Sequence, residues 1–193
     1  MKKILTAALF IFFVSGTCQA KNIKEAYFAG GCFWCMEDFL EKVKGVEEVI
    51  SGYSGGNVKN PTYKEVTYGN TGHFEVAKII YDQDLVTFKE LLNLYWKNID
   101  PFDSAGQFCD KGLSYRSVAF FKTSEEKNQI KNSIINIEKK FKGKKVVTFI
   151  RKFEKFYPAE DYHQDYYQEN FMNYLLYKKA CGREQTLKYI WKN

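Results

Sequence analysis

Residues 24–43 read KEAYFAGGCFWCMEDFLEKV, and this stretch predicts a short strand that turns directly into a helix. The strand covers 24–29, and Gly30-Gly31 breaks it. Apolar residues with the i, i+3, i+4, i+7 spacing of a helix face follow Cys32: Met36, Phe39, Leu40 and Val43. Gly45 is a natural end for this helix.

Strands and helices continue to alternate along the chain. We expect further strands at 46–53, 74–81, 116–121 and 146–150, helices at 87–99 and 124–141, loops at 54–70 and 103–115, and helix plus coil at 158–193. Thr87 and Glu90 have the spacing of a capping box. This order predicts the α+β class, as a two-layer α/β sandwich with a ferredoxin-like split βαβ core and an extended C-terminal segment.

The first twenty residues have the pattern of a secretory signal peptide. Lys2 and Lys3 precede an apolar run at 4–14, and the small residues Cys18 and Ala20 stand before the expected cleavage point. The run is too short to span a bilayer as a helix. We therefore expect 1–20 to be removed, 21–193 to form one domain without stable membrane insertion, and the protein to be exported, periplasmic or secreted. An uncleaved anchor and a lipoprotein start at Cys18 are the alternatives.

Composition limits the class of protein. The chain has 193 residues, a formal net charge of +6 and 45% hydrophobic residues, which excludes a disordered or collagen-like chain. The mild charge forms no dense basic stripe, so we expect no nucleic-acid partner. Four of the five cysteines remain after cleavage, enough to suggest a thiol site but too few for a disulfide scaffold: Cys32, Cys35, Cys109 and Cys181.

The sequence Cys32-Phe33-Trp34-Cys35 predicts a reactive thiol. A cysteine at a helix N-terminus meets free N–H donors and the positive end of the helix dipole, so we expect a lowered pKa for Cys32. Cys35 lies on the same helix face, within reach of a disulfide. A buried structural pair is an alternative, and so is zinc, although Cys109 and Cys181 stand alone and we expect no metal. No cofactor motif is present either.

Six motifs in one order resemble the A type of the peptide methionine sulfoxide reductase family. They cover about residues 24–170: GCFW at 31–34, GYSGG at 52–56, NPTY at 60–63, TGHFEV at 71–76, DKGLSYRS at 110–117 and AEDYHQ at 159–164. The resemblance implies thiol-dependent reduction of methionine S-sulfoxide, free and in proteins, as repair after oxidation. It also implies a thioredoxin-like dithiol reductant as partner, and we expect a monomer.

The chemistry requires a soft nucleophile and an acid that protonates the departing oxygen. Cys32 is the expected nucleophile, and Glu75 is the expected acid, because burial beside apolar neighbours would let it keep its proton. By resemblance, Tyr63 and Tyr115 donate hydrogen bonds to the sulfoxide oxygen, and Asp110 holds a water or the substrate backbone. Phe33 and Trp34 are expected to enclose the S-methyl group.

A second thiol must resolve the sulfenic acid that forms on Cys32. Many members of the family have glycine at the position of Cys35 and carry a resolving cysteine in a glycine-rich tail. Cys35 and Cys181 are both candidates here, and Cys109 is a further one. Two other functions stay open from the residues alone: an exported thiol–disulfide oxidoreductase that uses the Cys32–Cys35 pair, and a secreted metal- or peptide-binding module without catalysis.

Overall fold

A six-stranded sheet forms the centre of the computed structural model, which describes residues 20–192. The expected signal peptide, apart from Ala20, lies outside these residues. The strand order is β7-β6-β1-β3-β2-β8, and the strands are β1 (Ile23–Ala29), β2 (Val46–Ser54), β3 (Phe74–Asp82), β6 (Val118–Phe121), β7 (Phe149–Lys152) and β8 (Phe156–Pro158). Neighbouring strands are antiparallel except β6 and β7, which are parallel.

The inner strands confirm the predicted split βαβ core. Their order, β6-β1-β3-β2, places the first and third strands side by side and the second and the last at the flanks. Helix α1 (Phe33–Leu40) connects β1 to β2, and α3 (Phe88–Lys97) follows β3. Within the β2–β3 pair, Tyr53 lies opposite Glu75 near the end of the sheet where α1 begins.

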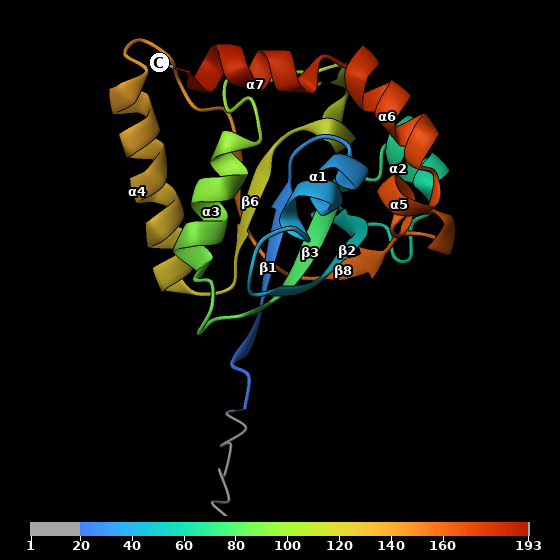
Figure 1. The fold of residues 1–193 in the computed structure, drawn as a ribbon, viewed down its shortest axis with the longest axis horizontal. Coiled ribbons are helices and arrows are strands. Elements are labelled where there is room, and N and C mark those ends of the chain that lie inside the picture. Colours follow the sequence, from blue (N-terminus) through green and yellow to red (C-terminus); the bar gives the residue numbers. More distant parts are fainter. Residues whose placement is uncertain (1–19, 193) are drawn as a thin grey trace, which may run out of the picture.

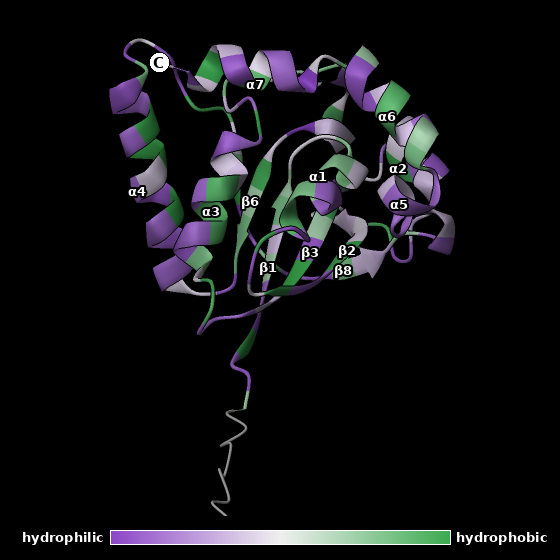
Figure 2. Cartoon of the chain, in the orientation of Figure 1, coloured by the Kyte–Doolittle hydropathy of each residue, from purple (hydrophilic) through white to green (hydrophobic). Residues whose placement is uncertain are grey.

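Helices cover one face of the sheet, as expected for two layers. Figure 1 shows α1 and α3 in front of the strands, with α4 (Ser124–Lys140) beside α3. The strands carry mostly apolar residues and the outer side of α4 mostly polar ones (Figure 2). In the core between the layers, the rings of Phe28 and Tyr95 stack at 4.7 Å, and the Tyr95 hydroxyl donates to the Ala29 carbonyl at 2.9 Å.

Three helices begin with a threonine whose hydroxyl accepts from the backbone three residues on. The Thr87 capping box is confirmed, and the same arrangement opens α4 at Thr123 and α2 (Tyr63–Tyr68) at Thr62. The prediction of a loop at 54–70 was therefore wrong in part. A capping box replaces free N–H groups by hydrogen bonds, so it stabilises even a short helix inside a glycine-rich segment.

Other boundaries also differ from the predictions. Helix α1 ends at Leu40 instead of Val43, because the chain turns there and reaches Gly45 at φ +96°, a conformation that suits glycine. The last predicted strand begins at Phe149 rather than Val146, and β8 was not predicted. The expected loop at 103–115 contains a small hairpin, β4 (Gly106–Gln107) and β5 (Asp110–Lys111), and a 3₁₀ turn at Leu113–Tyr115.

The C-terminal segment wraps around the helical side of the molecule. After a 3₁₀ turn (Asp161–His163) it forms α5 (Tyr166–Glu169), α6 (Phe171–Ala180) and α7 (Arg183–Trp191), which lead from α2 back toward α4 in Figure 1. The Trp191 indole N–H donates to the Ile99 carbonyl at 3.2 Å and secures the end. None of the helices in 20–192 has the length and apolar character needed to cross a membrane.

Candidate active site

Cys32 lies at the point where β1 passes into α1. Gly31 has φ +82°, and a Cβ atom there would lie 2.7 Å from Gln107 Cβ, so the turn requires glycine. Cys32 is the N-cap of α1, and its carbonyl accepts from the backbone N–H of Cys35 at 3.1 Å. Its side chain is only 5% exposed.

A cavity of about 60 Å³ lies beside Cys32. Its lining comes from α1, α2, β3, β5, the 3₁₀ turn and α6, and consists of Cys32, Phe33, Trp34, Tyr63, Glu75, Asp110, Tyr115 and Tyr177. Seven of these eight residues are predicted site residues. They lie between Cys32 and Tyr115 in the sequence, and the fold brings them together at one cavity. Tyr177 was missed, because its helix α6 has no polar or apolar pattern that marks one face.

Glu75 is the acid group of the cavity. It is 1% exposed, its Oε2 accepts from the Phe33 backbone N–H at 3.1 Å, and its buried Oε1 has no partner among the described residues. Burial raises the pKa of Glu75 to about 8. The carboxyl therefore keeps its proton at neutral pH.

Cys32 and Cys35 are both free and buried thiols. Burial raises the pKa of Cys32, so the expectation of a lowered pKa was wrong: loss of solvation outweighs the helix terminus. The pKa of Cys35 is lowered to about 7. Hydrogen bonding to the Cys32 thiol is the main cause and the charge of Arg183 adds to it, whereas burial acts in the opposite direction. Burial thus favours the neutral form of Cys32, whereas the surroundings of Cys35 favour its thiolate.

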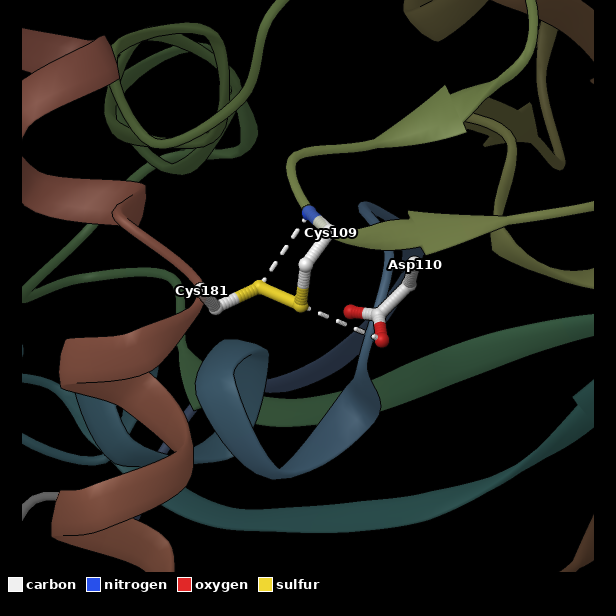
Figure 3. Close-up of side chains that lie close together, drawn as sticks. All are labelled: Cys109, Asp110 and Cys181. Atoms are coloured by element: carbon white, nitrogen blue, oxygen red, sulfur yellow. Dashed lines mark hydrogen bonds between the residues drawn. A yellow bond between two sulfur atoms is a disulfide. The ribbon is translucent and has the colours of Figure 1, made fainter.

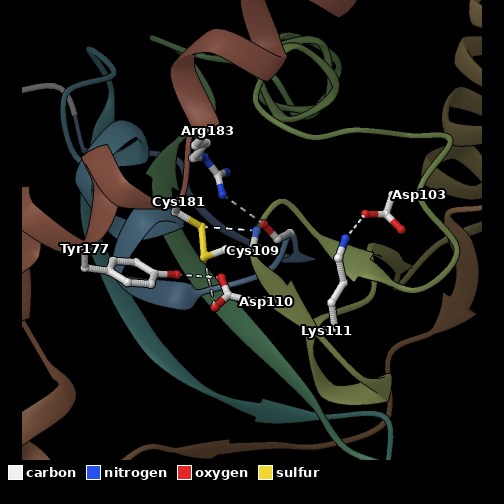
Figure 4. The surroundings of a disulfide bond; sticks show 8 residues. Asp103, Cys109, Asp110, Lys111, Tyr177, Cys181 and Arg183 are labelled. Carbon is white, nitrogen blue, oxygen red and sulfur yellow. Dashed lines mark hydrogen bonds and ion pairs between the residues drawn. A yellow bond between two sulfur atoms is a disulfide. The ribbon is translucent and has the colours of Figure 1, made fainter.

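Tyrosine hydroxyls surround the cavity. Tyr63 and Tyr115 both line the cavity, and burial raises the pKa of Tyr63 to about 12 and also raises that of Tyr115, so both keep their protons. Tyr177 donates to Asp110 Oδ2 at 2.5 Å (Figure 4). Burial raises the pKa of Asp110 in spite of this bond. These groups supply hydrogen-bond donors to a bound oxygen.

An aromatic cluster forms the apolar side of the cavity. Trp34 stacks on Tyr166 at 3.8 Å between ring centroids, which fixes its indole plane. Phe33 is fully buried and its ring lies 5.1 Å from that of His163. Apolar ring faces at the entrance of a small cavity suit a methyl thioether group better than a charged one.

Cys109 and Cys181 form a disulfide 72 residues apart in the sequence, at the tip of the β4–β5 hairpin (Figure 3). The Cys109 backbone N–H also lies 3.2 Å from Cys181 Sγ, and Cys109 Sγ lies 3.7 Å from Asp110 Oδ1. The sulfur of Cys181, a predicted resolving candidate, is thus bonded to Cys109 in this structure.

Two groups of possible metal ligands occur in the described part of the chain. The ligand atoms of Cys109, Asp110 and Cys181 lie within 4.8 Å of one another, but disulfide sulfurs are not thiolate ligands. The other group consists of Glu37, Glu41 and Asp165. The Asp165 backbone N–H donates to Glu37 at 3.2 Å and the Tyr167 hydroxyl donates to Glu41 at 2.5 Å, so protein donors already occupy part of it.

Comparisons with known proteins identify a family and several relatives that are similar to this chain. A family model described as peptide methionine sulfoxide reductase matches residues 24–193. The chain is 43% identical over 174 residues to peptide methionine sulfoxide reductase MsrA of Limosilactobacillus reuteri, covering 89% of this chain and 99% of that one. It is 45% identical to MsrA/MsrB of Vibrio cholerae, where it covers 88% of its own length but spans only 45% of the relative.

Solved structures share the fold. Mxr1 from Saccharomyces cerevisiae in reduced form matches with a TM-score of 0.72 and 30% identity, over 77% of this chain and 86% of that chain. Methionine sulfoxide reductase A of Corynebacterium diphtheriae matches with a TM-score of 0.70 and 28% identity, over 77% and 76%.

Proposed function

The chain belongs to the peptide methionine sulfoxide reductase family, and we propose that Cys32, Glu75 and Cys35 carry out its reaction. That reaction is the thiol-dependent reduction of methionine sulfoxide, so the chain is an oxidoreductase. A role as an exported thiol–disulfide oxidoreductase is not favoured. The observation that carries the assignment is a buried, protonated carboxyl with one free oxygen in the same small cavity as a thiol.

The first step transfers oxygen from the substrate to Cys32. Glu75 gives its proton to the sulfoxide oxygen while Cys32 sulfur attacks the substrate sulfur and releases its own proton to Cys35. The S–O bond of the substrate breaks, an S–O bond forms on Cys32, and methionine leaves. Cys32 becomes a sulfenic acid, Cys35 a thiol and Glu75 a carboxylate.

Hydroxyl groups and rings orient the substrate for this step. Tyr63 and Tyr115 donate hydrogen bonds to the sulfoxide oxygen, since their raised pKa keeps them protonated. Asp110, fixed by Tyr177, holds a water or the substrate backbone. The rings of Phe33 and Trp34 enclose the S-methyl group.

Cys35 resolves the sulfenic acid. Its thiol attacks Cys32 sulfur, water leaves, and a Cys32–Cys35 disulfide forms, which an external dithiol reduces. Two features support Cys35 over Cys181: it lies one helical turn from Cys32, and Cys181 is bonded to Cys109. A thioredoxin-like dithiol is the proposed reductant, the protein acts as a monomer, and free and protein-bound S-sulfoxide are the proposed substrates.

The test uses N-acetylmethionine sulfoxide with dithiothreitol and measures the N-acetylmethionine product. We expect Cys32→Ser to abolish turnover, whereas Cys18→Ser, outside the proposed domain, keeps it. Separated sulfoxide epimers show whether only the S form is consumed. Full activity of Cys32→Ser overturns the assignment of the nucleophile.

Export of the protein from the cytoplasm is a separate proposal. Residues 1–20 direct export, and cleavage after Ala20 leaves β1 whole, since this strand begins at Ile23. The Cys109–Cys181 disulfide suits an oxidising compartment. N-terminal sequencing of the exported protein is expected to begin at Lys21, and recovery of the chain inside the cell with its leader intact contradicts export.

A further inference from the structure

Arg183 is a buried cation that forms no ion pair with any residue of the described part of the chain. It is 4% exposed, and its guanidinium donates to the carbonyls of Gly30 at 3.3 Å and Asn98 at 2.6 Å, with Met36 Sδ at 3.8 Å. None of the ion pairs within 20–192 includes it. A buried charge without compensation strongly destabilises a fold, so a nearby negative charge is expected.

The position of Arg183 indicates where that charge lies. Gly30 precedes Cys32 by two residues and Met36 follows Cys35 directly, so the guanidinium contacts the chain on both sides of the thiol pair. Its charge lowers the pKa of Cys35 and counteracts the rise at Asp110. The titratable and charged groups around Cys35 are Cys32, Glu75, Tyr174, Tyr177, Lys178 and Arg183.

Lys178, the other cation near Cys35, is already neutralised. Its Nζ lies 2.8 Å from Asp38 Oδ2 and 3.9 Å from a Glu184 carboxylate oxygen, and it is partly exposed to solvent. Pairing and solvent screening weaken its effect on a buried thiolate. Arg183 is therefore the cation whose charge is free to act on Cys35.

The chain around Arg183 is fixed from two directions. Cys181 is bonded to Cys109, and Gly182 takes φ +66° to start α7, so Arg183 enters the interior within two residues of the disulfide (Figure 4). The guanidinium also lies 4.5 Å from the Phe108 ring centroid. Phe108 has φ +53°, a strained conformation for a non-glycine residue that its neighbours must hold.

We propose that Arg183 is a positioning residue of the reductase reaction and that its charge holds the Cys32–Cys35 pair in its ionised state. In this proposal the Cys109–Cys181 disulfide holds Arg183 in place. Its part in catalysis rests on the proposed role of Cys35 as the thiol that takes the proton of Cys32. The same charge stabilises the reduced pair over its disulfide, because oxidation removes the thiolate, so it also favours reduction by an external dithiol.

The test measures ionisation of Cys35 without substrate. In a full-length Cys32→Ser background, whose hydroxyl still donates to Cys35, the rate of iodoacetamide labelling is followed from pH 5 to 9 without reductant. Peptide mass spectrometry assigns the label to Cys35 rather than to Cys18. Adding Arg183→Met is expected to move the midpoint up by about 1 pH unit and to slow labelling at pH 6 about tenfold.

Two variants separate charge from structure. Lys188→Met removes an exposed cation from the same helix and is expected to leave the midpoint in place. Arg183→Lys keeps the charge and is expected to stay within about 0.3 pH unit of the parent. An unchanged midpoint in folded Arg183→Met overturns the proposal. Should that variant not fold, a shift of about 1 pH unit in folded Arg183→Lys overturns it instead.

The role of the disulfide is tested in the same assay. Cys109→Ser/Cys181→Ser is expected to move the midpoint of Cys35 in the same direction as Arg183→Met, and an unchanged midpoint overturns the holding role. The labelling assay also separates this proposal from the proposed role of Cys35 in turnover, because labelling does not require turnover. If Cys35 is not the resolving thiol, the labelling shift persists, while thiol counting after one turnover shows a disulfide between Cys32 and another cysteine.

Discussion

Replacing Glu75 by glutamine is expected to abolish activity and to stabilise the fold at neutral pH. Glutamine retains an oxygen that accepts from the Phe33 N–H, a bond of 3.1 Å in the native protein. It has no acidic proton to give to the sulfoxide oxygen. Loss of a general acid lowers turnover by roughly 100- to 10,000-fold.

The gain in stability follows from the raised pKa of Glu75. The pKa is 4.5 in the unfolded chain and about 8 in the fold. Between these values the folded chain binds one proton more than the unfolded chain, so stability falls as pH rises. At pH 7 the penalty is at most about 3 kcal/mol, and glutamine removes it.

The measurement is urea unfolding at pH 5 and pH 7, together with the N-acetylmethionine sulfoxide assay. The excess stability of Glu75→Gln over the native protein is expected to be largest at pH 7 and to fall to about 1 kcal/mol at pH 5, because pH 5 lies only just above the pKa of 4.5 in the unfolded chain. Glu37→Gln is the matched control. Glu37 is also buried, with its pKa raised to about 8, but it lies outside the cavity, so this variant is expected to be stabilised and active.

Two results would contradict a protonated, catalytic Glu75. Turnover of Glu75→Gln within threefold of the native rate would show that the proton comes from another group. Equal stability differences at pH 5 and pH 7 would show that Glu75 is ionised in the fold.

The remaining predictions concern thiols, pH and a helix cap. Cys35→Ser is expected to release one equivalent of N-acetylmethionine more slowly than the native protein, because serine is a poor acceptor for the Cys32 proton, and then to stall without a resolving thiol, while Cys181→Ser keeps turning over; the reverse pattern in a quenched-flow assay contradicts the assignment of Cys35. Under non-reducing conditions, Cys109→Ser is expected to lower the free energy of unfolding by about 4 kcal/mol, because the disulfide closes a loop of 72 residues, and equal urea midpoints contradict this. The native pH–rate profile is expected to rise near pH 7 with Cys35 and fall near pH 8 with Glu75, and a flat profile from 6 to 9 contradicts both ionisations. Thr87→Ala removes a capping box and is expected to lower the free energy of unfolding by about 1 kcal/mol in the same measurement.

Local patterns in the sequence predicted the core of the fold well. The strand–Gly-Gly–helix stretch around Gly31 and the capping box at Thr87 depend on neighbours within a few residues, so they are visible in the sequence. The Thr62–Glu65 capping box was equally visible, but surrounding glycine and proline favoured a loop. Boundaries such as the end of α1 at Leu40 depend on how the chain meets β2, which no local pattern records.

Contacts between distant segments were harder to predict. The motif that contains Cys32 and the one that contains Glu75 lie far apart in the sequence, and the fold places both residues at one cavity. The bond between Cys109 and Cys181 joins positions 72 residues apart, and nothing near either cysteine identifies its partner. Arg183 lies in a polar helix, where arginine is ordinarily solvated, and only the tertiary structure shows that it is buried. The sign of the pKa change at Cys32 likewise depended on burial rather than on its place in the helix.

The disulfide formed in a single turnover shows directly whether Cys32 is the nucleophile and Cys35 the resolving thiol. Protein with reduced Cys32 and Cys35 is mixed with one equivalent of N-acetylmethionine sulfoxide without reductant, trapped with a thiol label and mapped by mass spectrometry. We expect one equivalent of N-acetylmethionine, a new Cys32–Cys35 disulfide and an unchanged Cys109–Cys181 bond. A disulfide between Cys32 and Cys109 or Cys181, or product from a protein that lacks the Cys32 thiol, would contradict these assignments.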